Sequence, residues 1–180
     1  MPDQSKPPAP ESAAPPIVAS FISEWVVCSE KEYTLLTEFA EGVPKISLFD
    51  FQMETLIYGL HCLDRGVFAY FGDGYRTAFM SEAFAFACGM FAEVLPEPQR
   101  QQFLEEFDRH CATRHLEYGV MKPLMAEGTS AMRNVLPYEF SKRLCIDAGV
   151  FNPPVQIALM EWSGEIMTTM LKVAGTLLPH

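Results

Sequence analysis

The stretch SLFDFQMETLIYGLHCLDRGVFAYF, residues 47–71, decides the fold class of this chain. Its large apolar residues recur at spacings of three and four, which is the period of one face of an α-helix. Ser47 can cap the start of that helix, and the sequence Gly72-Asp73-Gly74 ends it. We therefore predict an amphipathic helix between residues 48 and 71.

Two further segments, 75–95 and 153–177, are rich in apolar residues and carry few charges. The first contains AFMSEAFAFACGMFAEV, which is apolar almost all round and typical of a helix buried on every side. The second begins after Asn152 with two prolines, as expected of a capped helix start. Its charged residues are Glu161, Glu165 and Lys172. We expect these two helices to form the centre of the molecule.

The rest of the chain also favours helices over strands. Apolar spacing, capping residues and breaking residues predict further helices at 17–28, 29–39, 98–121, 127–135 and 138–148. No alternating runs of β-branched residues separated by tight turns are present, so we do not expect a sheet. With 49% hydrophobic residues, the sequence predicts one all-α domain over residues 17–180. The domain should be a single helical bundle of about five to seven helices.

Residues 1–16 have a different character. They hold six prolines, and their remaining residues cannot bury enough apolar surface to offset the entropy lost on ordering. We expect a disordered, Pro-rich N-terminal tail. This stretch also lacks the charged and apolar regions of a secretory signal peptide.

Cysteine usage and hydropathy indicate a cytoplasmic protein. Five cysteines, an odd number, are widely spaced inside apolar helical patterns, as expected of reduced core residues. They are Cys28, Cys62, Cys88, Cys111 and Cys145. The longest uncharged segment, 148–160, is too short to span a bilayer and contains two prolines, so no membrane span is expected.

The chain is acidic, with a formal net charge of −10. Its 13 basic residues are scattered, and the longest basic run is the pair Lys142-Arg143. Because nucleic-acid binding depends on clustered positive charge, we exclude nucleic acid as a partner. The acidity itself is typical of a solvated surface.

One face of the helix at 48–71 carries polar residues. Glu54, Tyr58, His61 and Asp64 follow one another at spacings of four, three and three, so they share one side of the helix. Carboxylates and imidazoles on such a stripe can bind a metal inside a bundle. The simpler interpretation is a solvated or interhelical stripe of neighbouring pairs.

A second polar stripe lies on the helix at 98–121. An apolar stripe that begins at Phe103 and Phe107 turns polar at His110, Cys111, Arg114 and Tyr118. If the two stripes meet, they form a buried hydrogen-bonded network and a candidate ligand site. That site would comprise Glu54, Tyr58, His61, Asp64, His110, Arg114 and Tyr118. A metal, if bound, would be held by Glu54, His61, Asp64 and His110.

Two other patterns have a structural and a functional interpretation. Cys111 and His115 lie one turn apart and could form a nucleophilic pair, although the sequence shows no oxyanion donor and buried cysteines are common. The helical glycines Gly59, Gly66 and Gly89 indicate close helix packing or room for a small apolar ligand.

These observations favour a non-catalytic helical interaction or assembly protein. It would either self-associate as a homo-oligomer or dock a protein partner through apolar helix faces. The alternative is a helical bundle that binds a small ligand or a metal, and could be an enzyme, through the polar cluster around Glu54, His61, Asp64 and His110. A third class is a regulatory module that blocks another protein with its acidic surface. No catalytic signature is present, and we expect no cofactor.

Overall fold

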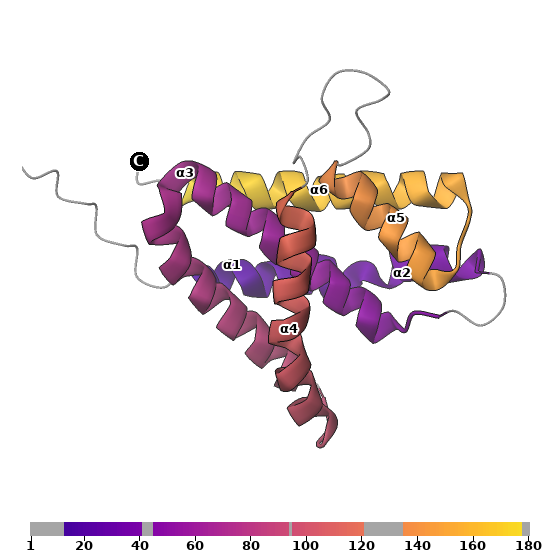
Figure 1. Ribbon diagram of the computed structural model, residues 1–180, viewed down its shortest axis with the longest axis horizontal. Coiled ribbons are helices and arrows are strands. Elements are labelled where there is room, and N and C mark those ends of the chain that lie inside the picture. Colours follow the sequence, from indigo (N-terminus) through magenta and orange to yellow (C-terminus); the bar gives the residue numbers. More distant parts are fainter. Residues whose placement is uncertain (1–12, 41–44, 94, 121–134, 178–180) are drawn as a thin grey trace, which may run out of the picture.

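Helices make up nearly all of the described chain. The computed structural model describes residues 13–40, 45–93, 95–120 and 135–177 (Figure 1). Its elements are α1 (Ala14–Phe21), a π-helical segment (Ile22–Val26), a 3-10 turn (Val27–Ser29), α2 (Glu30–Glu38), α3 (Leu48–Glu93), α4 (Gln99–Gly119), α5 (Leu136–Ala148) and α6 (Pro153–Thr176). The described residues confirm the all-α prediction, and their six α-helices lie within the predicted number.

Local sequence signals account for the helix starts. The hydroxyl of Ser47 accepts a hydrogen bond from the backbone N–H of Asp50, whose carboxylate accepts one from the N–H of Ser47. This reciprocal pair caps α3 as the sequence predicted. The side chain of Asn152 likewise accepts a hydrogen bond from the N–H of Val155 and caps α6.

Helix α3 is bent sharply at Gly72. This residue has φ 72° and ψ −176°, a conformation that a residue with a Cβ rarely adopts. The bend divides α3 into a first arm, residues 48–71, and a second arm, residues 73–93. In Figure 1 the second arm runs from the bend to the lower tip of the molecule, and α4 returns from that tip across the first arm. The predicted turn at 72–74 is therefore a kink inside one long element.

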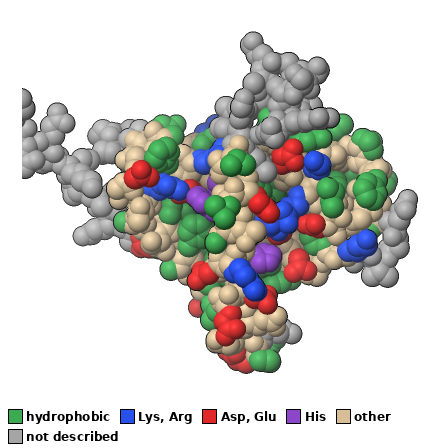
Figure 2. Space-filling model, viewed as in Figure 1, with side chains coloured by type: hydrophobic (Ala, Val, Ile, Leu, Met, Phe, Trp, Pro, Cys, Tyr) green, Lys and Arg blue, Asp and Glu red, His purple; other side chains and the backbone are tan. Residues whose placement is uncertain are grey.

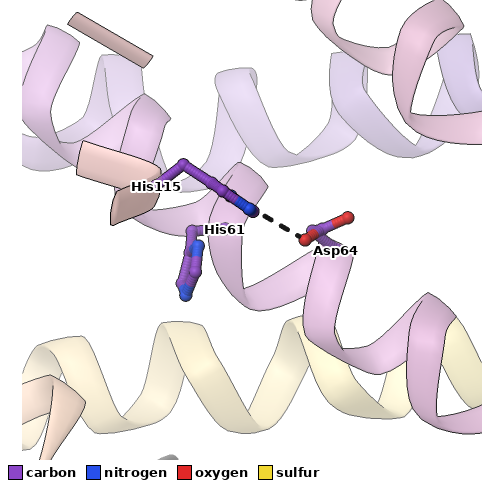
Figure 3. A group of neighbouring side chains, drawn as sticks. All are labelled: His61, Asp64 and His115. Carbon is purple, nitrogen blue, oxygen red and sulfur yellow. Dashed lines mark ion pairs between the residues drawn. The ribbon is translucent and has the colours of Figure 1, made fainter. Parts of the chain in front are cut away.

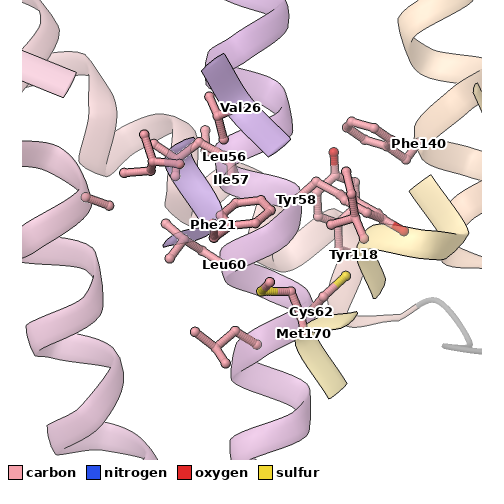
Figure 4. Close-up of a cluster of buried hydrophobic side chains, with 14 of the residues drawn as sticks. Phe21, Val26, Leu56, Ile57, Tyr58, Leu60, Cys62, Tyr118, Phe140 and Met170 are labelled. Atoms are coloured by element: carbon pink, nitrogen blue, oxygen red, sulfur yellow. The ribbon is translucent and has the colours of Figure 1, made fainter. Parts of the chain in front are cut away.

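The first arm of α3 is the centre of the molecule. All residues from 54 to 64 are buried, and the arm packs against α1, α4 and α6. Figure 4 shows Phe21 and Val26 beside Leu56, while Phe140 and other aromatic side chains gather around Tyr58. The core is accordingly built around this helix.

The prediction that 75–95 and 153–177 form the centre is wrong. On the second arm Ser81, Ala85 and Gly89 are exposed, so this helix is not buried on every side. Helix α6 buries one stripe against α3 and α5, and its opposite face leaves Ile157 51% exposed. Both segments have a high apolar content, but each forms a helix that is buried on one side only.

Two of the three glycines serve close packing. A Cβ on Gly66 would lie 2.7 Å from the Cβ of Ala174 on α6, and a Cβ on Gly59 would collide with the ring of Phe21. The helices approach closely at these two positions, as the sequence predicted. Gly89 differs, because no atom lies within 4 Å of a Cβ built there.

The N-terminal boundary differs from the prediction. Helix α1 begins at Ala14, inside the range predicted as tail, because Pro15 and Pro16 occupy its first turn, where proline is tolerated. Residues 1–12 and most of the predicted helix 127–135 lie outside the described residues. Among the described helices, none combines the length and apolarity needed to cross a membrane.

Candidate functional site

Glu54 of α3 and Arg114 of α4 form a buried ion pair. The Nε of Arg114 donates to Oε2 of Glu54 at 2.8 Å, and its Nη2 donates to Oε1. The two side chains are only 6% and 7% exposed. Either charge alone would be costly at this depth, so the pair holds α4 against the first arm of α3. The two polar stripes predicted from the sequence therefore face each other.

The ion pair continues into α5. Glu117 accepts hydrogen bonds from Arg114 at 3.0 Å and from Arg143 at 2.7 Å, and Arg143 also lies 3.4 Å from Asp147. Arg65 of α3 makes another contact with α4: its Nη2 donates to the backbone carbonyl of Tyr118 at 3.0 Å. That bond satisfies a carbonyl in the last turn of α4.

Asp64 pairs with Arg76 across the bend of α3. The Nε and Nη2 of Arg76 donate to the two carboxylate oxygens at 2.6 Å and 2.7 Å, a bidentate arrangement. The Asp64 side chain is 6% exposed. Nδ1 of His115 on α4 lies 4.0 Å from Oδ2 of the same carboxylate. Asp64 thus lies between the second arm of α3 and α4.

His61 is buried and lacks a hydrogen-bond partner. It is 4% exposed, and neither ring nitrogen finds a donor or acceptor among the described residues. Its ring centre lies 5.4 Å from that of His115 and 5.4 Å from that of Tyr118. Figure 3 shows His61, Asp64 and His115 gathered where the first arm of α3 meets α4. An unpaired buried imidazole is uncommon in folded proteins.

Burial lowers the pKa of His61 to about 4, and the nearby positive charge of Arg65 acts in the same direction. His115 and Arg76 lower this pKa further, while Asp64 opposes them. The imidazole is therefore neutral at neutral pH, so one ring nitrogen has a free lone pair.

The two tyrosines of the predicted site also meet. Tyr58 and Tyr118 are both 1% exposed or less, and their ring centres are 6.1 Å apart. The hydroxyl of Tyr58 donates to the backbone carbonyl of Ser163 at 3.0 Å, whereas that of Tyr118 has no partner among the described residues. Burial raises the pKa of both phenols, so both stay protonated.

The geometry does not favour a cysteine nucleophile. Burial raises the pKa of Cys111 to about 12, and Asp108 adds to that rise. A thiol with such a pKa is not a thiolate at neutral pH, and the thiolate is the reactive form. All five cysteines are free thiols in the structure.

Two depressions adjoin the polar cluster. A small hollow of about 510 Å³ is lined by His61, Asp64, Arg65, Phe68, Asp73, Arg76, His115 and Gly119. A large groove of about 1080 Å³ runs between the second arm of α3 and α4 and shares Asp64, Arg76 and His115 with the hollow. The apolar residues that line the large groove are Met80, Phe84, Ala85, Cys88, Leu104, Cys111, Ala112 and Leu116.

The structure brings most of the predicted site residues together. Glu54, Tyr58, His61, Asp64, Arg114 and Tyr118 lie at the contact between α3 and α4. His110 lies at its margin, with Nδ1 3.9 Å from Glu54, too far for a hydrogen bond. Arg76 was not among the predicted site residues, and it reaches Asp64 across the bend at Gly72. His115 was likewise absent from the predicted ligand set, although it lies in the cluster with His61 and Asp64.

Comparisons with models of protein families, with curated proteins and with solved structures found no match.

Proposed function

We propose that this protein is a non-catalytic interaction module whose large groove binds an amphipathic helix of a partner protein. The observation that carries the proposal is the groove itself. It has a volume of about 1080 Å³ and a largely apolar lining on two helices that diverge from each other. Helix-in-groove binding is a common use of such a surface.

Exposed apolar side chains along the groove support this function. Leu116 is 76% exposed and Leu104 is 39% exposed, and both line the groove on α4. Phe84 lines the facing side on α3. An apolar surface that stays open to water is typical of a binding site for another protein.

The length of the groove suits a helix. On α4 the groove is lined from Leu104 to Leu116, a stretch that corresponds to roughly 20 Å at 1.5 Å per residue. Because the groove is an open channel at the upper end of the size range of small-molecule pockets, we favour a helix over a small ligand. A helix could place apolar residues along its length at spacings of three and four.

The charge around the groove favours a basic partner. Exposed carboxylates lie on both helices that form it, at Glu93, Glu105 and Asp108. Figure 2 shows acidic side chains gathered over the lower tip, where the second arm of α3 ends and α4 begins. Arg76, the basic residue in the lining, is already paired with Asp64. We therefore propose a helix with an apolar face and positive charges beside it.

Binding of designed peptides tests this function. Three labelled amphipathic helices would share one Leu/Phe face and carry positive, neutral or negative polar faces. We expect the positive peptide to bind most tightly in fluorescence anisotropy. Ala85→Arg places a bulky cation in the groove and should weaken binding at least about tenfold, or about 1.4 kcal/mol. Ala69→Arg, at an exposed position of the same helix outside the groove, is the matched control.

Two results would contradict the proposal. One is that none of the three peptides binds, and the other is that Ala85→Arg and Ala69→Arg weaken binding equally. A competing outcome is that the groove binds a second copy of this chain, which would make the protein a homo-oligomer. Light scattering would then report a dimer that Ala85→Arg dissociates and Ala69→Arg does not.

A cytoplasmic location belongs to the same proposal. It is supported by the five free cysteines, two of which, Cys88 and Cys111, line the groove. Free thiols persist in a reducing compartment. Fractionation of cells that express the tagged chain would test the location, and recovery in an oxidising compartment would contradict it.

A further inference from the structure

We propose that His61, Asp64 and His115 bind a divalent transition metal ion, with Zn²⁺ as the ion that suits them best. One ligand atom from each residue lies within 4.8 Å of the other two. The proposal goes beyond the groove function, because metal binding needs no partner helix. It also changes the ligand set expected from the sequence, which contained Glu54 and His110.

The buried state of His61 is the independent observation that points to a ligand. Its ring is 4% exposed, and both nitrogens lack partners among the described residues. The side chain lines the small hollow together with Asp64 and His115. Coordination by a metal would satisfy a nitrogen that the surrounding described side chains leave unpaired.

The spacing of the three side chains is close to that of a metal site. Zinc takes ligands at about 2.0 to 2.2 Å, so the ligand atoms of a tetrahedral site lie roughly 3.4 Å apart. Closing a separation of up to 4.8 Å needs a small movement. His115 can supply it, because its side chain is 49% exposed and lies on the open side of the cluster.

Arg76 orients Asp64 without occupying all of its acceptor capacity. The guanidinium takes one hydrogen bond on each carboxylate oxygen. A carboxylate has about four lone-pair sites, so two remain for a metal. Metal-binding carboxylates commonly have such a hydrogen-bonded support. The positive charge of Arg76 will lower the affinity of the site for a metal ion. We therefore do not expect a tightly held structural ion here.

Ligand chemistry decides the class of ion. Two imidazole nitrogens and one carboxylate suit zinc and its first-row neighbours, whereas Mg²⁺ and Ca²⁺ prefer oxygen ligands. Glu54 lies outside this ligand set, because the atoms that lie within 4.8 Å of one another belong to His61, Asp64 and His115. Its carboxylate is instead paired with Arg114. Three protein ligands leave a coordination position open toward the hollow, which is the arrangement of an exchangeable site.

Metal titration of the untagged full chain tests the site. After chelator treatment, Zn²⁺ is added in competition with a chromophoric chelator, and Mg²⁺ is added to a parallel sample. We expect one Zn²⁺ per chain and no effect of Mg²⁺. His115→Ala, at a half-exposed position that should fold normally, is expected to weaken Zn²⁺ binding at least about tenfold.

His110→Ala is the matched control, because it removes a histidine from the same helix outside the cluster. Its affinity for Zn²⁺ should stay close to that of the unchanged chain. Co²⁺ provides a second readout: a visible absorption band should form with the unchanged chain and with His110→Ala, and disappear with His115→Ala. Absence of Zn²⁺ binding, or equal losses from His110→Ala and His115→Ala, would overturn the proposal. Neither result bears on the binding of a peptide in the groove.

Discussion

Glu54 and Arg114, 60 residues apart in the sequence, form the buried bidentate ion pair that joins α3 to α4. The pair is a buried contact between these two helices, and residues of α4 line the large groove and complete the cluster of His61, Asp64 and His115. Its energetic contribution is therefore the first property to measure.

Removing one partner of this pair should be costly. We expect Arg114→Met to lower the free energy of unfolding by about 3 to 5 kcal/mol, because Glu54 is left charged and buried. The double variant Glu54→Leu/Arg114→Met should recover much of that loss. Urea unfolding measures both, and Arg109→Met, in the exposed pair with Glu106, is the control, with an expected change within about 1 kcal/mol. Equal effects of Arg114→Met and Arg109→Met would contradict the structure at this contact.

The helical glycines should respond oppositely to alanine. Gly66→Ala should destabilise the protein, because the added Cβ would lie 2.7 Å from the Cβ of Ala174. Gly89→Ala should stabilise it by about 0.5 to 1 kcal/mol, since the site is open and alanine is the better helix former. Thermal unfolding of both variants provides the comparison. The packing of α3 against α6 would be in doubt if Gly66→Ala were neutral.

The two buried tyrosines form a second matched pair. Tyr58→Phe removes the hydrogen bond to the carbonyl of Ser163 and should cost about 1 to 2 kcal/mol. Tyr118→Phe removes a buried hydroxyl that has no partner among the described residues, so it should be neutral or stabilising. Chemical denaturation of both variants tests this order, and the reverse order would be inconsistent with the contact.

The low pKa of His61 predicts a loss of stability in mild acid. Its folded-state pKa is about 4 and its unfolded value is 6.5, so the unfolded chain binds more protons between these values. Stability therefore falls as the pH falls through this window. Between pH 7 and pH 5, in chelator-treated buffer, the unchanged chain should lose about 2 kcal/mol more than His61→Gln.

Two measurements check this pH dependence. Urea unfolding at both pH values gives the difference in stability, and NMR of the His61 ring gives its titration midpoint directly. The charged and titratable groups around the ring are Arg65, Asp64 and Arg76 on α3, and His115 and Tyr118 on α4. A midpoint near 6.5, or parallel pH profiles for the two chains, would show that the ring is exposed to water.

Much of the fold could be predicted because it depends on local signals. The spacing of apolar residues at 48–71, the cap at Ser47 and the break at Gly72 each act within a few residues. The central helix could not be predicted in this way. Segment 75–95 is more apolar than 48–71, but burial depends on how many neighbours a helix has, and Ala85 and Gly89 line an open groove.

The site could be predicted only in part for the same reason. Residues such as Glu54, His61 and Arg114 share helix faces that can be read from their spacing. Which residue pairs with which depends on how two helices are aligned, and spacing carries no information about that. Arg76 reaches Asp64 through the bend, and His115 replaces His110 beside His61 because of the way α4 crosses α3.

Hydrogen–deuterium exchange with the positively charged amphipathic peptide tests the central claim, the groove as a binding site, most directly. We expect peptide binding to slow exchange in residues 77–89 of α3 and 104–116 of α4, the two sides of the groove. The competing surface is a depression of about 590 Å³ beside α6, lined by Trp25, Met160 and their neighbours. Protection confined to α6, or no protection at peptide concentrations that saturate the anisotropy signal, would contradict the account.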